Sequence, residues 1–584
     1  MRNAKWFDGL LIAGVCALAG CGGMVSSGGK SSTESAQAAE ATLPKPPRPR
    51  PDPPKLLPDP ISDAAASRFL AQAPFGVTRA DIARVKSLGY AGWLDEQLDP
   101  VRTPMTKVLP KLQQSIANGL PETDLSQAQR RNTWLWQAAT APDQLRMRMA
   151  FALSEIFVVS DQSSGQGQIM RVADYQDTLA HNAFGSYRSL LKAVTLHPAM
   201  GAYLSHAGNQ KASADGKITP DENYGREVMQ LFSIGLSKRN QDFSLVMSNG
   251  APVPTYDQSV IAAMARVFTG WTYAGLTDAQ FAKGRIDSTS YAPMQCHPAF
   301  HDDQPKTIFN GIVISNGSDC VADLDAAMNA LSQHANTAPF ISRQLIQRFV
   351  TSNPSPEYIQ RVARVWTSSG GNLGQVLRTI LLDSEARTAP AAGNTSYGKP
   401  REPLLRIANM WRSYGAKYVP PVNGSVRFQV SGSGDLTTTI AQDSLRAPSV
   451  FNFFEPDYRI PMSDGNLGIY APELQIINES TFTTGNNQTN SFLWNYADTV
   501  APTVNTKAPV LNIAGLVQLA DAGNYSGMVD DVNLLLFANG MSSTTWGALT
   551  TMLQRLHDNN RTSSELARSL LLLALVSPEY AIQR

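Results

Sequence analysis

The chain has 584 residues, of which 43% are hydrophobic and 17% are charged, and its formal net charge is +1. This length and apolar content can bury a substantial core, and length alone would suit roughly two to four domains. A near-neutral charge excludes nucleic acid or an anionic membrane face as the main partner, because both need concentrated positive charge.

The N-terminus has the features of an export signal. Arg2 and Lys5 precede an apolar run, residues 9–21, that ends in small residues, as in a cleaved signal peptide. Its last four residues, Leu-Ala-Gly-Cys, resemble the bacterial lipobox. The resemblance implies cleavage after residue 20, lipidation of Cys21 and, in a Gram-negative host, sorting to the outer membrane. We therefore expect a lipid-anchored protein of the cell envelope; the alternative is an ordinary signal peptide with a chance cysteine.

Residues 21–62 are expected to form a stalk. Residues 22–42 are rich in Ser, Ala and Gly, a composition typical of disorder. Closely spaced prolines over residues 44–54 favour an extended polyproline spacer of ~3.1 Å per residue. We expect this spacer to hold the folded part away from the membrane, and a docking motif for a proline-binding domain is the alternative. No later segment has the unbroken apolar run of ~20 residues that a membrane span requires.

From residue 63 onward, apolar residues recur at the three- and four-residue spacing of amphipathic helices. The expected helices cover residues 64–73, 79–88, 91–98, 105–118, 126–140, 142–159, 175–181, 186–194, 221–235, 259–267, 324–332, 338–350, 356–368, 373–382, 401–414, 510–520, 528–536, 545–556 and 563–575. The sequence therefore predicts an all-α fold with long irregular loops and at most a few short strands. We expect residues 63–584 to form a single large helical domain.

Two segments interrupt this pattern. Residues 272–320 are irregular and rich in Pro, Gly, Asp and His. Residues 415–505 are polar and rich in Gly, Asn and Ser, so we expect a loop-rich subregion there. Short strands are expected within it at residues 426–430 and 437–440, where β-branched residues gather.

The cysteines agree with export. Cys16 leaves with the signal peptide and Cys21 carries the lipid, so Cys296 and Cys320 remain. Two remaining thiols in an oxidising compartment most simply pair. A disulfide closing a loop of this size contributes ~3 kcal/mol by the chain-entropy model. Metal binding by both is the alternative, although no CxxC spacing supports it.

The densest polar cluster of the chain lies in residues 221–235. A start signal at Asp221 and a stop signal at Gly235 indicate a helix. Glu222 and Arg226 are four residues apart, as are Asn223 and Glu227, so the four side chains project from neighbouring parts of one surface.

Two interpretations of this turn stay open. In the first, Glu222 and Glu227 do acid–base chemistry, while Asn223 and Arg226 position a substrate. In the second, the same groups form a buried ion-pair network that joins helices, because charged groups are tolerated inside a protein only when paired.

A second polar cluster follows Cys296. His297, His301 and Asp302 could bind a divalent metal such as zinc, and His301 with Asp302 could instead complete a catalytic or substrate-binding site. The spacing matches no metal signature, so an ordinary structural loop is the alternative. Lys306 is expected to pair with Asp302 or with Glu227.

Trp271 follows the expected helix 259–267 directly after Thr269-Gly270. An indole in this position could form the wall of a binding pocket for a sugar or another ring. Packing in the core is the alternative, because a tryptophan buries a large apolar surface.

Several common chemistries have no motif here. The chain lacks a G-x-S-x-G elbow, an H-E-x-x-H pair, a Walker loop and a dinucleotide-binding glycine fingerprint after a strand. Serine hydrolase, zincin, nucleotide-binding and NAD-dependent functions therefore have no basis in the sequence.

Segments along almost the whole of residues 65–584 resemble, in the same order, a bacterial family known as domain of unknown function 1800. The matching residues are Arg68-Phe69-Leu70, Phe75-Gly76, 223–227, Leu231, Gly235, 265–271, His301-Asp302, Lys306, Gly311, 339–345, 447–453 and 577–579. The resemblance implies an exported, helical protein and establishes no activity. It also implies a partner, because members often accompany exported proteins of a second family, domain of unknown function 1501.

The chain departs from this family at two places. Many members carry a Trp-His-Asn-His run where this chain has residues 152–157, Ala-Leu-Ser-Glu-Ile-Phe. Many also carry a histidine where this chain has Phe232. These departures put in doubt any metal site built on the family's histidines.

The favoured interpretation is a binding or assembly protein that holds a secreted partner or a glycan. The alternative is a hydrolase-like enzyme that uses a Glu/Arg/His polar centre, with or without a divalent metal. The two are distinguished by structure. An enzyme needs Arg226, Glu227 and His301 around one open pocket, whereas a scaffold needs them sealed inside an ion-paired core.

Overall fold

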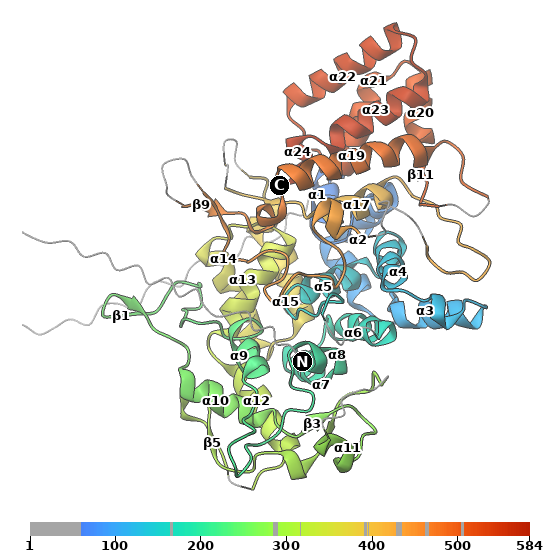
Figure 1. Ribbon diagram of the computed structural model, residues 1–584. Coiled ribbons are helices and arrows are strands. Elements are labelled where there is room, and N and C mark those ends of the chain that lie inside the picture. Colours follow the sequence, from blue (N-terminus) through green and yellow to red (C-terminus); the bar gives the residue numbers. More distant parts are fainter. Residues whose placement is uncertain are drawn as a thin grey trace, which may run out of the picture. The chain divides into compact units, whose positions relative to one another are not determined.

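The computed structural model describes residues 60–163, 168–283, 290–315, 317–390, 394, 396–427, 435–461, 467–503 and 507–584. All of them belong to one of the two units into which the chain divides, Pro53–Arg584. The predicted signal peptide, Cys21 and the predicted stalk as far as residue 59 lie outside the described residues. Helices account for most of the described secondary structure (Figure 1), which confirms the predicted all-α class.

Sixteen α-helices precede residue 390 in the part of the chain that the structure describes. They are α1 Asp63–Gln72, α2 Arg79–Leu98, α3 Val108–Ala117, α4 Gln127–Thr140, α5 Gln144–Ser154, α6 Ile169–Asn182, α7 Tyr187–Leu196, α8 Pro198–Tyr203, α9 Asn223–Gln230, α10 Gln258–Val267, α11 Asp278–Ala282, α12 Cys320–Gln333, α13 Thr337–Phe349, α14 Pro356–Ser368, α15 Leu373–Leu382 and α16 Ser384–Arg387. Short 3₁₀ turns lie between them at Glu122–Asp124, Pro298–Phe300 and Phe309–Gly311.

The remaining helices pack largely on one another. They are α17 Pro403–Ser413, α18 Thr437–Ile440, α19 Glu479–Tyr496, α20 Ala514–Asp521, α21 Tyr525–Leu536, α22 Ser543–Asp558, α23 Ser563–Leu575 and α24 Pro578–Ala581, with a 3₁₀ turn at Pro472–Ile476. Helix α23 contacts α19, α20, α21 and α22, and the red helices of Figure 1 form this group.

The described strands are short and form only two-stranded pairs. The antiparallel pairs are β1 Met247–Ser248 with β2 Ala251–Pro252, β3 Trp271–Thr272 with β4 Gln295–Cys296, β5 Lys306–Thr307 with β6 Val313–Ile314, β7 Lys399–Pro400 with β12 Ile582–Gln583, and β8 Arg459–Pro461 with β9 Leu467–Tyr470. One pair, β10 Ala497–Asp498 with β11 Leu511–Asn512, is parallel. None of these pairs is long enough to organise the fold, and the β3–β4 pair places Trp271 opposite Cys296.

Local signals explain where several helices begin, bend and end. Ser126 and Gln129 form a capping box at the start of α4, and Thr562 with Glu565 does the same for α23. The predicted break between residues 79–88 and 91–98 is a kink inside α2, where Gly89 has φ +73°, a conformation that glycine adopts without strain.

The polar segment 415–505 differs most from the sequence prediction. The strand expected at residues 437–440 is wrong, because these residues form helix α18. The Asp435 carboxylate accepts hydrogen bonds from the Thr437 amide and hydroxyl, 3.0 and 2.6 Å long, and such a cap outweighs the strand preference of three threonines. Helix α19 lies in the same segment, and its Thr- and Asn-rich sequence hides the helical pattern. The strand expected at 426–430 falls partly outside the described residues, and residues 426 and 427 form no strand.

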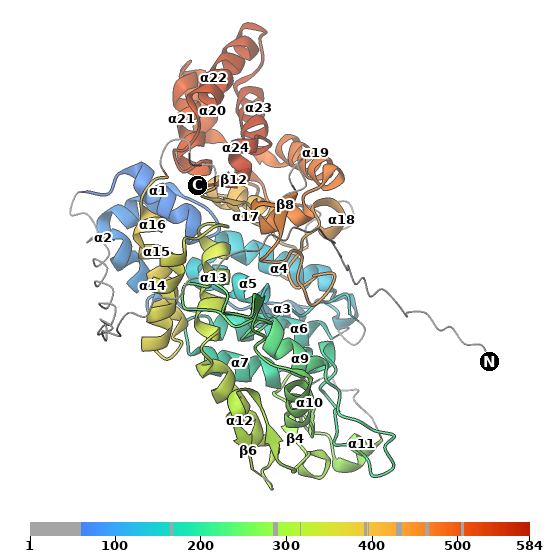
Figure 2. The same ribbon diagram turned by 90° about the vertical axis from the view of Figure 1, so that its left-hand side faces the viewer.

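Helix α13 lies deep in the core. It packs against α14 and α15 (Figure 2), and twelve of its thirteen residues are buried, including Gln344 and Arg348. Helix α5 is buried along nearly its whole length as well and carries Arg146 and Arg148 inward. Buried polar groups are costly unless they are paired, so these two helices carry the polar groups that need partners in the centre of the fold.

Candidate functional site

The predicted turn at residues 221–235 forms a shorter helix than expected. Helix α9 runs from Asn223 to Gln230, and Gly235, with φ +69°, lies in the loop beyond it. Arg226 pairs with Glu222 at 3.1 Å, four residues earlier as predicted. Both side chains are more than a third exposed, and Asn223 is exposed too. This pair is therefore a solvent-accessible ion pair at the surface of α9.

Glu227 turns in the opposite direction and is buried. Burial raises the pKa of its carboxyl, and the charge of Arg226 opposes that change only in part. Its negative charge in turn adds to the burial effect that raises the pKa of Tyr203 and of Tyr256, each to about 12. The buried Oε2 atom of Glu227 has no hydrogen-bond partner among the described residues.

His301 belongs to a separate, fully buried cluster. Its Nδ1 atom lies 2.9 Å from the Thr269 carbonyl oxygen, and its Nε2 atom lies 3.1 Å from Oδ2 of Asp323. The same Oδ2 atom accepts from Lys306 at 2.6 Å, and Lys306 also donates to the main chain of Asp302 and Gln304. Lys306 therefore pairs chiefly with Asp323, lies 4.0 Å from the Asp302 carboxylate and makes no ion pair with Glu227.

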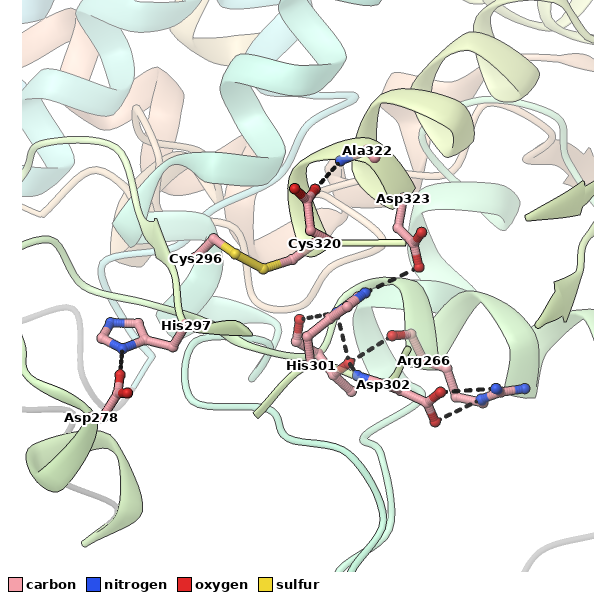
Figure 3. The surroundings of a disulfide bond; sticks show 11 residues. Arg266, Asp278, Cys296, His297, His301, Asp302, Cys320, Ala322 and Asp323 are labelled. Carbon is pink, nitrogen blue, oxygen red and sulfur yellow. Dashed lines mark hydrogen bonds and ion pairs between the residues drawn. A yellow bond between two sulfur atoms is a disulfide. The ribbon is translucent and has the colours of Figure 1, made fainter. Parts of the chain in front are cut away.

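Asp302 and His297 face different partners (Figure 3). Arg266 of α10 donates two hydrogen bonds to the Asp302 carboxylate, 2.8 and 2.9 Å long, and these lower the pKa of Asp302 against the effect of burial. His297 pairs with Asp278 at 2.6 Å. Within the described ranges, no three His, Cys, Asp or Glu residues are arranged to hold a metal ion.

The predicted disulfide is present. Cys296, at the end of β4, is joined to Cys320, the first residue of α12, with 6.1 Å between the Cα atoms (Figure 3). The bond ties the loop that carries His297 and His301 to the helix that carries Asp323. This arrangement fixes the buried cluster of His301, Lys306 and Asp323.

Helix α10 lies between the two predicted polar centres. A Cβ atom at Gly225 would lie 3.1 Å from the Ala265 amide nitrogen, so α9 approaches the backbone of α10 closely. The next residue of α10, Arg266, holds Asp302. The two centres are thus neighbours through α10, but Arg226, Glu227 and His301 line none of the described cavities. Trp271 is buried in the core and lines none of them either.

A cavity of about 320 Å³ lies next to α9, on segments that sequence reasoning left without a chemical role. Its lining comes from the end of α5, the end of α9 and the following loop, α13 and the segment 450–457. The lining residues are Glu155, Ile156, Gln230, Leu231, Gly235, Leu236, Ser237, Arg239, Phe243, Phe340, Gln344, Arg348, Val450, Phe451, Asn452, Phe454, Glu455, Pro456 and Asp457. A volume of this size fits a small ligand.

Gly235 shows how closely these segments meet. A Cβ atom added there would lie 2.8 Å from the Phe340 ring, a distance at which atoms clash. Its φ of +69° also belongs to the left-handed region, which a side chain disfavours. A glycine at this position therefore lets the loop after α9 reach α13 and close one side of the cavity.

Charged side chains that are sealed from solvent lie behind this cavity. Glu155 faces Nε of Arg348 at 3.4 Å, and Arg148 donates to the Arg348 carbonyl at 2.6 Å. Glu402 interacts with Arg148 at 3.8 Å and with Lys399 at 3.3 Å.

Lys399 also pairs with Glu473 at 2.9 Å. Gln442 donates to both Glu155 and Glu402, at 3.3 and 2.9 Å. Three carboxylates thus share three cations, and this group is called the Glu155–Glu402 network below.

The members of this network hold their protons differently. Burial raises the pKa of Glu155 to about 8, and Arg348 offsets only part of that effect. Burial also acts on Glu402, but Lys399, Arg148 and Arg348 together outweigh it and lower its pKa to about 2. Glu155 therefore carries a proton at neutral pH, while Glu402 is ionised. Such separation of two carboxyl groups is found in catalytic sites and in structural networks alike.

Two amide side chains in the cavity wall lack partners. Neither the nitrogen nor the oxygen of the Asn452 amide has a hydrogen-bond partner among the described residues, and the same holds for Nε2 of Gln344. Both side chains are 6% exposed. A buried polar atom without a partner costs about 1–3 kcal/mol, so water or a polar ligand is expected at these atoms.

Sequence reasoning named none of the polar residues of this cavity as site residues, although most lie in or beside the segments that carry the family resemblance. Glu155 falls in the place of the Trp-His-Asn-His run. Phe232, in place of the second family histidine, packs against Phe157 with 5.4 Å between the ring centroids. The two departures are therefore adjacent in space, and an aromatic contact occupies that place.

Comparison with known proteins returned one result. A family model described as "Protein of unknown function (DUF1800)" matches residues 68–582. No curated protein and no solved structure gives a significant match. Among the described residues, no helix combines the length and apolar character needed to cross a membrane.

Proposed function

We propose a function for this chain, which belongs to the family described as "Protein of unknown function (DUF1800)", from its cavity and its N-terminal sequence. The protein is a lipid-anchored binding protein of the cell envelope. Its ligand is an uncharged glycan that occupies the cavity between α9, α13 and residues 450–457.

The observation that carries this proposal is the pair of unpartnered amides at the cavity wall. Asn452 offers both a donor and an acceptor, and Gln344 offers a donor. A sugar hydroxyl is itself both donor and acceptor, so it can satisfy such groups together. A site built to hydrogen-bond a hydroxyl discriminates strongly against ligands that lack it, because its buried polar groups then stay unpaired.

The remaining lining suits an uncharged ligand with apolar faces. Phe243, Phe340, Phe451 and Phe454 supply aromatic walls, against which the C–H faces of a sugar can pack. The cationic and acidic side chains of the lining oppose one another. Arg239 and Arg348 are set against Glu455 and Asp457, so no excess charge would select an ion.

The N-terminal sequence supports the location. The apolar run that ends in Leu-Ala-Gly-Cys predicts lipidation at Cys21, and the proline-rich spacer predicts a stalk. Mass spectrometry of the purified protein tests this point. Diacylglycerol on Cys21 is expected, and a mature chain that starts elsewhere without lipid would refute it.

Binding is tested with an array of soluble oligosaccharides and the full mature chain in detergent. Asn452→Ala removes both amide atoms and should weaken binding of the recognised sugar at least ~10-fold, which corresponds to about 1.4 kcal/mol. Asn495→Ala is the matched control, because Asn495 is exposed and lines none of the described cavities. Equal binding by both variants would contradict the assignment of the site.

A hydrolytic enzyme is the second candidate, and the protonated Glu155 favours it. A carboxyl with a raised pKa at a cavity wall can donate its proton to the oxygen of a departing alcohol. Glu455 and Asp457 line the same cavity, and either could take a proton from the attacking water as an inverting glycosidase requires. The water would supply hydroxide to the sugar carbon as the glycosidic bond breaks.

Glu155→Gln distinguishes the two candidates. A binding protein keeps its affinity for the glycan in this variant and releases no product with either chain. An enzyme keeps binding but loses turnover by at least ~100-fold, the usual contribution of a general acid.

A partner from the family called domain of unknown function 1501 is proposed as well. It rests on the family resemblance, since members of the two families often accompany each other. Affinity purification of the anchored chain from its own envelope tests this proposal, and absence of any such protein under crosslinking would contradict it.

A further inference from the structure

Two arginines far from the cavity described above lie side by side without a carboxylate partner. Arg68 of α1 donates through Nη1 to the carbonyl oxygen of Arg387, 3.4 Å away. Arg387 ends α16 and donates to the side-chain oxygen of Gln72. Among the described residues, neither arginine makes an ion pair with a carboxylate, whereas most other partly buried arginines of the chain do.

The surroundings of the two guanidinium groups are aromatic rather than acidic. Arg387 lies over the rings of Phe69 and Tyr90, 4.9 and 5.5 Å from their centroids. Arg68 lies 5.7 Å from the centroid of Tyr397 and 3.4 Å from its hydroxyl. Stacking of this kind holds a guanidinium in a fixed orientation and leaves its edge free for an anion.

Hydrogen bonding in this pair is incomplete. The Nε atoms of Arg68 and Arg387 are buried and have no partner among the described residues. Burial lowers the pKa of Arg387 to about 10, and the charge of Arg68 adds to that effect. A buried cation needs a counter-charge, and the described residues supply none to either group.

Both arginines line a cavity of about 790 Å³ between the start of α1, the end of α16 and the residues around α24. Its other charged residues are Arg584 and Glu579. Glu579 already accepts hydrogen bonds from the amide and hydroxyl of Ser542 and from the hydroxyl of Thr545. Three arginines therefore face one carboxylate that has donors of its own.

We propose that Arg68 and Arg387 form a binding site for a phosphate group in this cavity. Paired guanidinium groups present several donors in planar forks, which match the oxygens of a phosphate. Two unpaired cations also match its double negative charge. The site shares no lining residue with the proposed glycan cavity, so it stands or falls independently of that function.

The phosphate could belong to a soluble compound or to a lipid headgroup. The experiment uses the full mature chain and isothermal titration with inorganic phosphate, against sodium chloride of equal ionic strength. We expect saturable binding by the wild type and at least a tenfold loss in Arg68→Gln and in Arg387→Gln. Arg84→Gln is the control, because Arg84 is an exposed arginine paired with Glu96 outside this cavity.

A second arm separates the two sources. The same variants are floated with vesicles of phosphatidylglycerol and of phosphatidylcholine, after removal of the chain's own lipid by Cys21→Ser. Selective flotation with phosphatidylglycerol that is lost in Arg68→Gln identifies a lipid headgroup, and phosphate binding without flotation identifies a soluble compound. The proposal is overturned if phosphate does not bind the wild type, or if Arg68→Gln binds it as tightly as the control. Arg68 is partly exposed, so this variant keeps the test valid if Arg387→Gln fails to fold.

Discussion

Replacing Glu155 by glutamine should remove a pH dependence from the stability of the protein. The folded-state pKa of Glu155 is about 8, against an ordinary value of 4.5. A group whose pKa rises on folding stabilises the protein fully below its unfolded pKa, and this contribution is lost as pH rises toward the folded pKa. The wild type should therefore lose about 4 kcal/mol, from this residue alone, between about pH 5 and pH 9.

The glutamine variant isolates this effect. Its amide keeps an acceptor toward Gln442 and a donor toward Glu402, which resembles the protonated carboxyl, and it does not titrate. Near pH 5 the two proteins should have similar free energies of unfolding. Near pH 9 the variant should be the more stable by about 4 kcal/mol, because the wild type then carries a buried charge that Arg348 compensates only in part.

Urea unfolding followed by circular dichroism across this pH range is the assay. Glu122→Gln is the control, because Glu122 is exposed and its substitution should leave the pH profile of the wild type unchanged. Profiles of wild type and Glu155→Gln that stay parallel from pH 5 to pH 9 would refute the protonation assigned to the Glu155–Glu402 network.

Three further predictions concern the polar clusters around α9 and α12. Asp323→Asn should destabilise the protein by about 3–5 kcal/mol, because it leaves Lys306 buried without its carboxylate; a loss below about 1 kcal/mol in urea unfolding would contradict this. Replacing Cys296 and Cys320 together by alanine should cost about 3 kcal/mol, and the reduced wild type should unfold at the same urea concentration as the variant. Arg226→Ala should change stability by less than about 1 kcal/mol, because its ion pair is exposed to solvent; a larger effect would show that Arg226 compensates Glu227.

Much of the fold follows from local signals. The helices that pack one apolar face inward, such as α7, α14 and α15, fall within a few residues of their predicted bounds, because their periodicity and caps agree. Helix α19 was missed because it exposes most of its Thr- and Asn-rich surface and buries only Phe492 and Leu493. Its formation depends on packing against α18 and α23, which no local pattern reports.

The two predicted polar centres were found by residue type, but their partners could not be predicted. Lys306 was expected to pair with Asp302 or Glu227, whereas its main partner, Asp323, lies on a helix that only the disulfide and the packing of α10 bring close. Glu155 gave no signal at all, since a single glutamate after an apolar helix usually lies at the surface. Its burial requires α13 and residues 442–457, which are far away in the sequence.

The sequence by itself determined the helical class, the pairing of Cys296 with Cys320 and the i to i+4 pair of Glu222 with Arg226, because each depends on spacing along the chain or on cysteine count. Only the tertiary structure decided which charges are sealed and which face a cavity. It separated His301 from Glu227 across α10, joined Glu155 to Arg348, and left Asn452 and the pair Arg68–Arg387 without partners. The physical reason is that burial and desolvation depend on what surrounds a side chain in space, and chain neighbours supply only a small part of those surroundings.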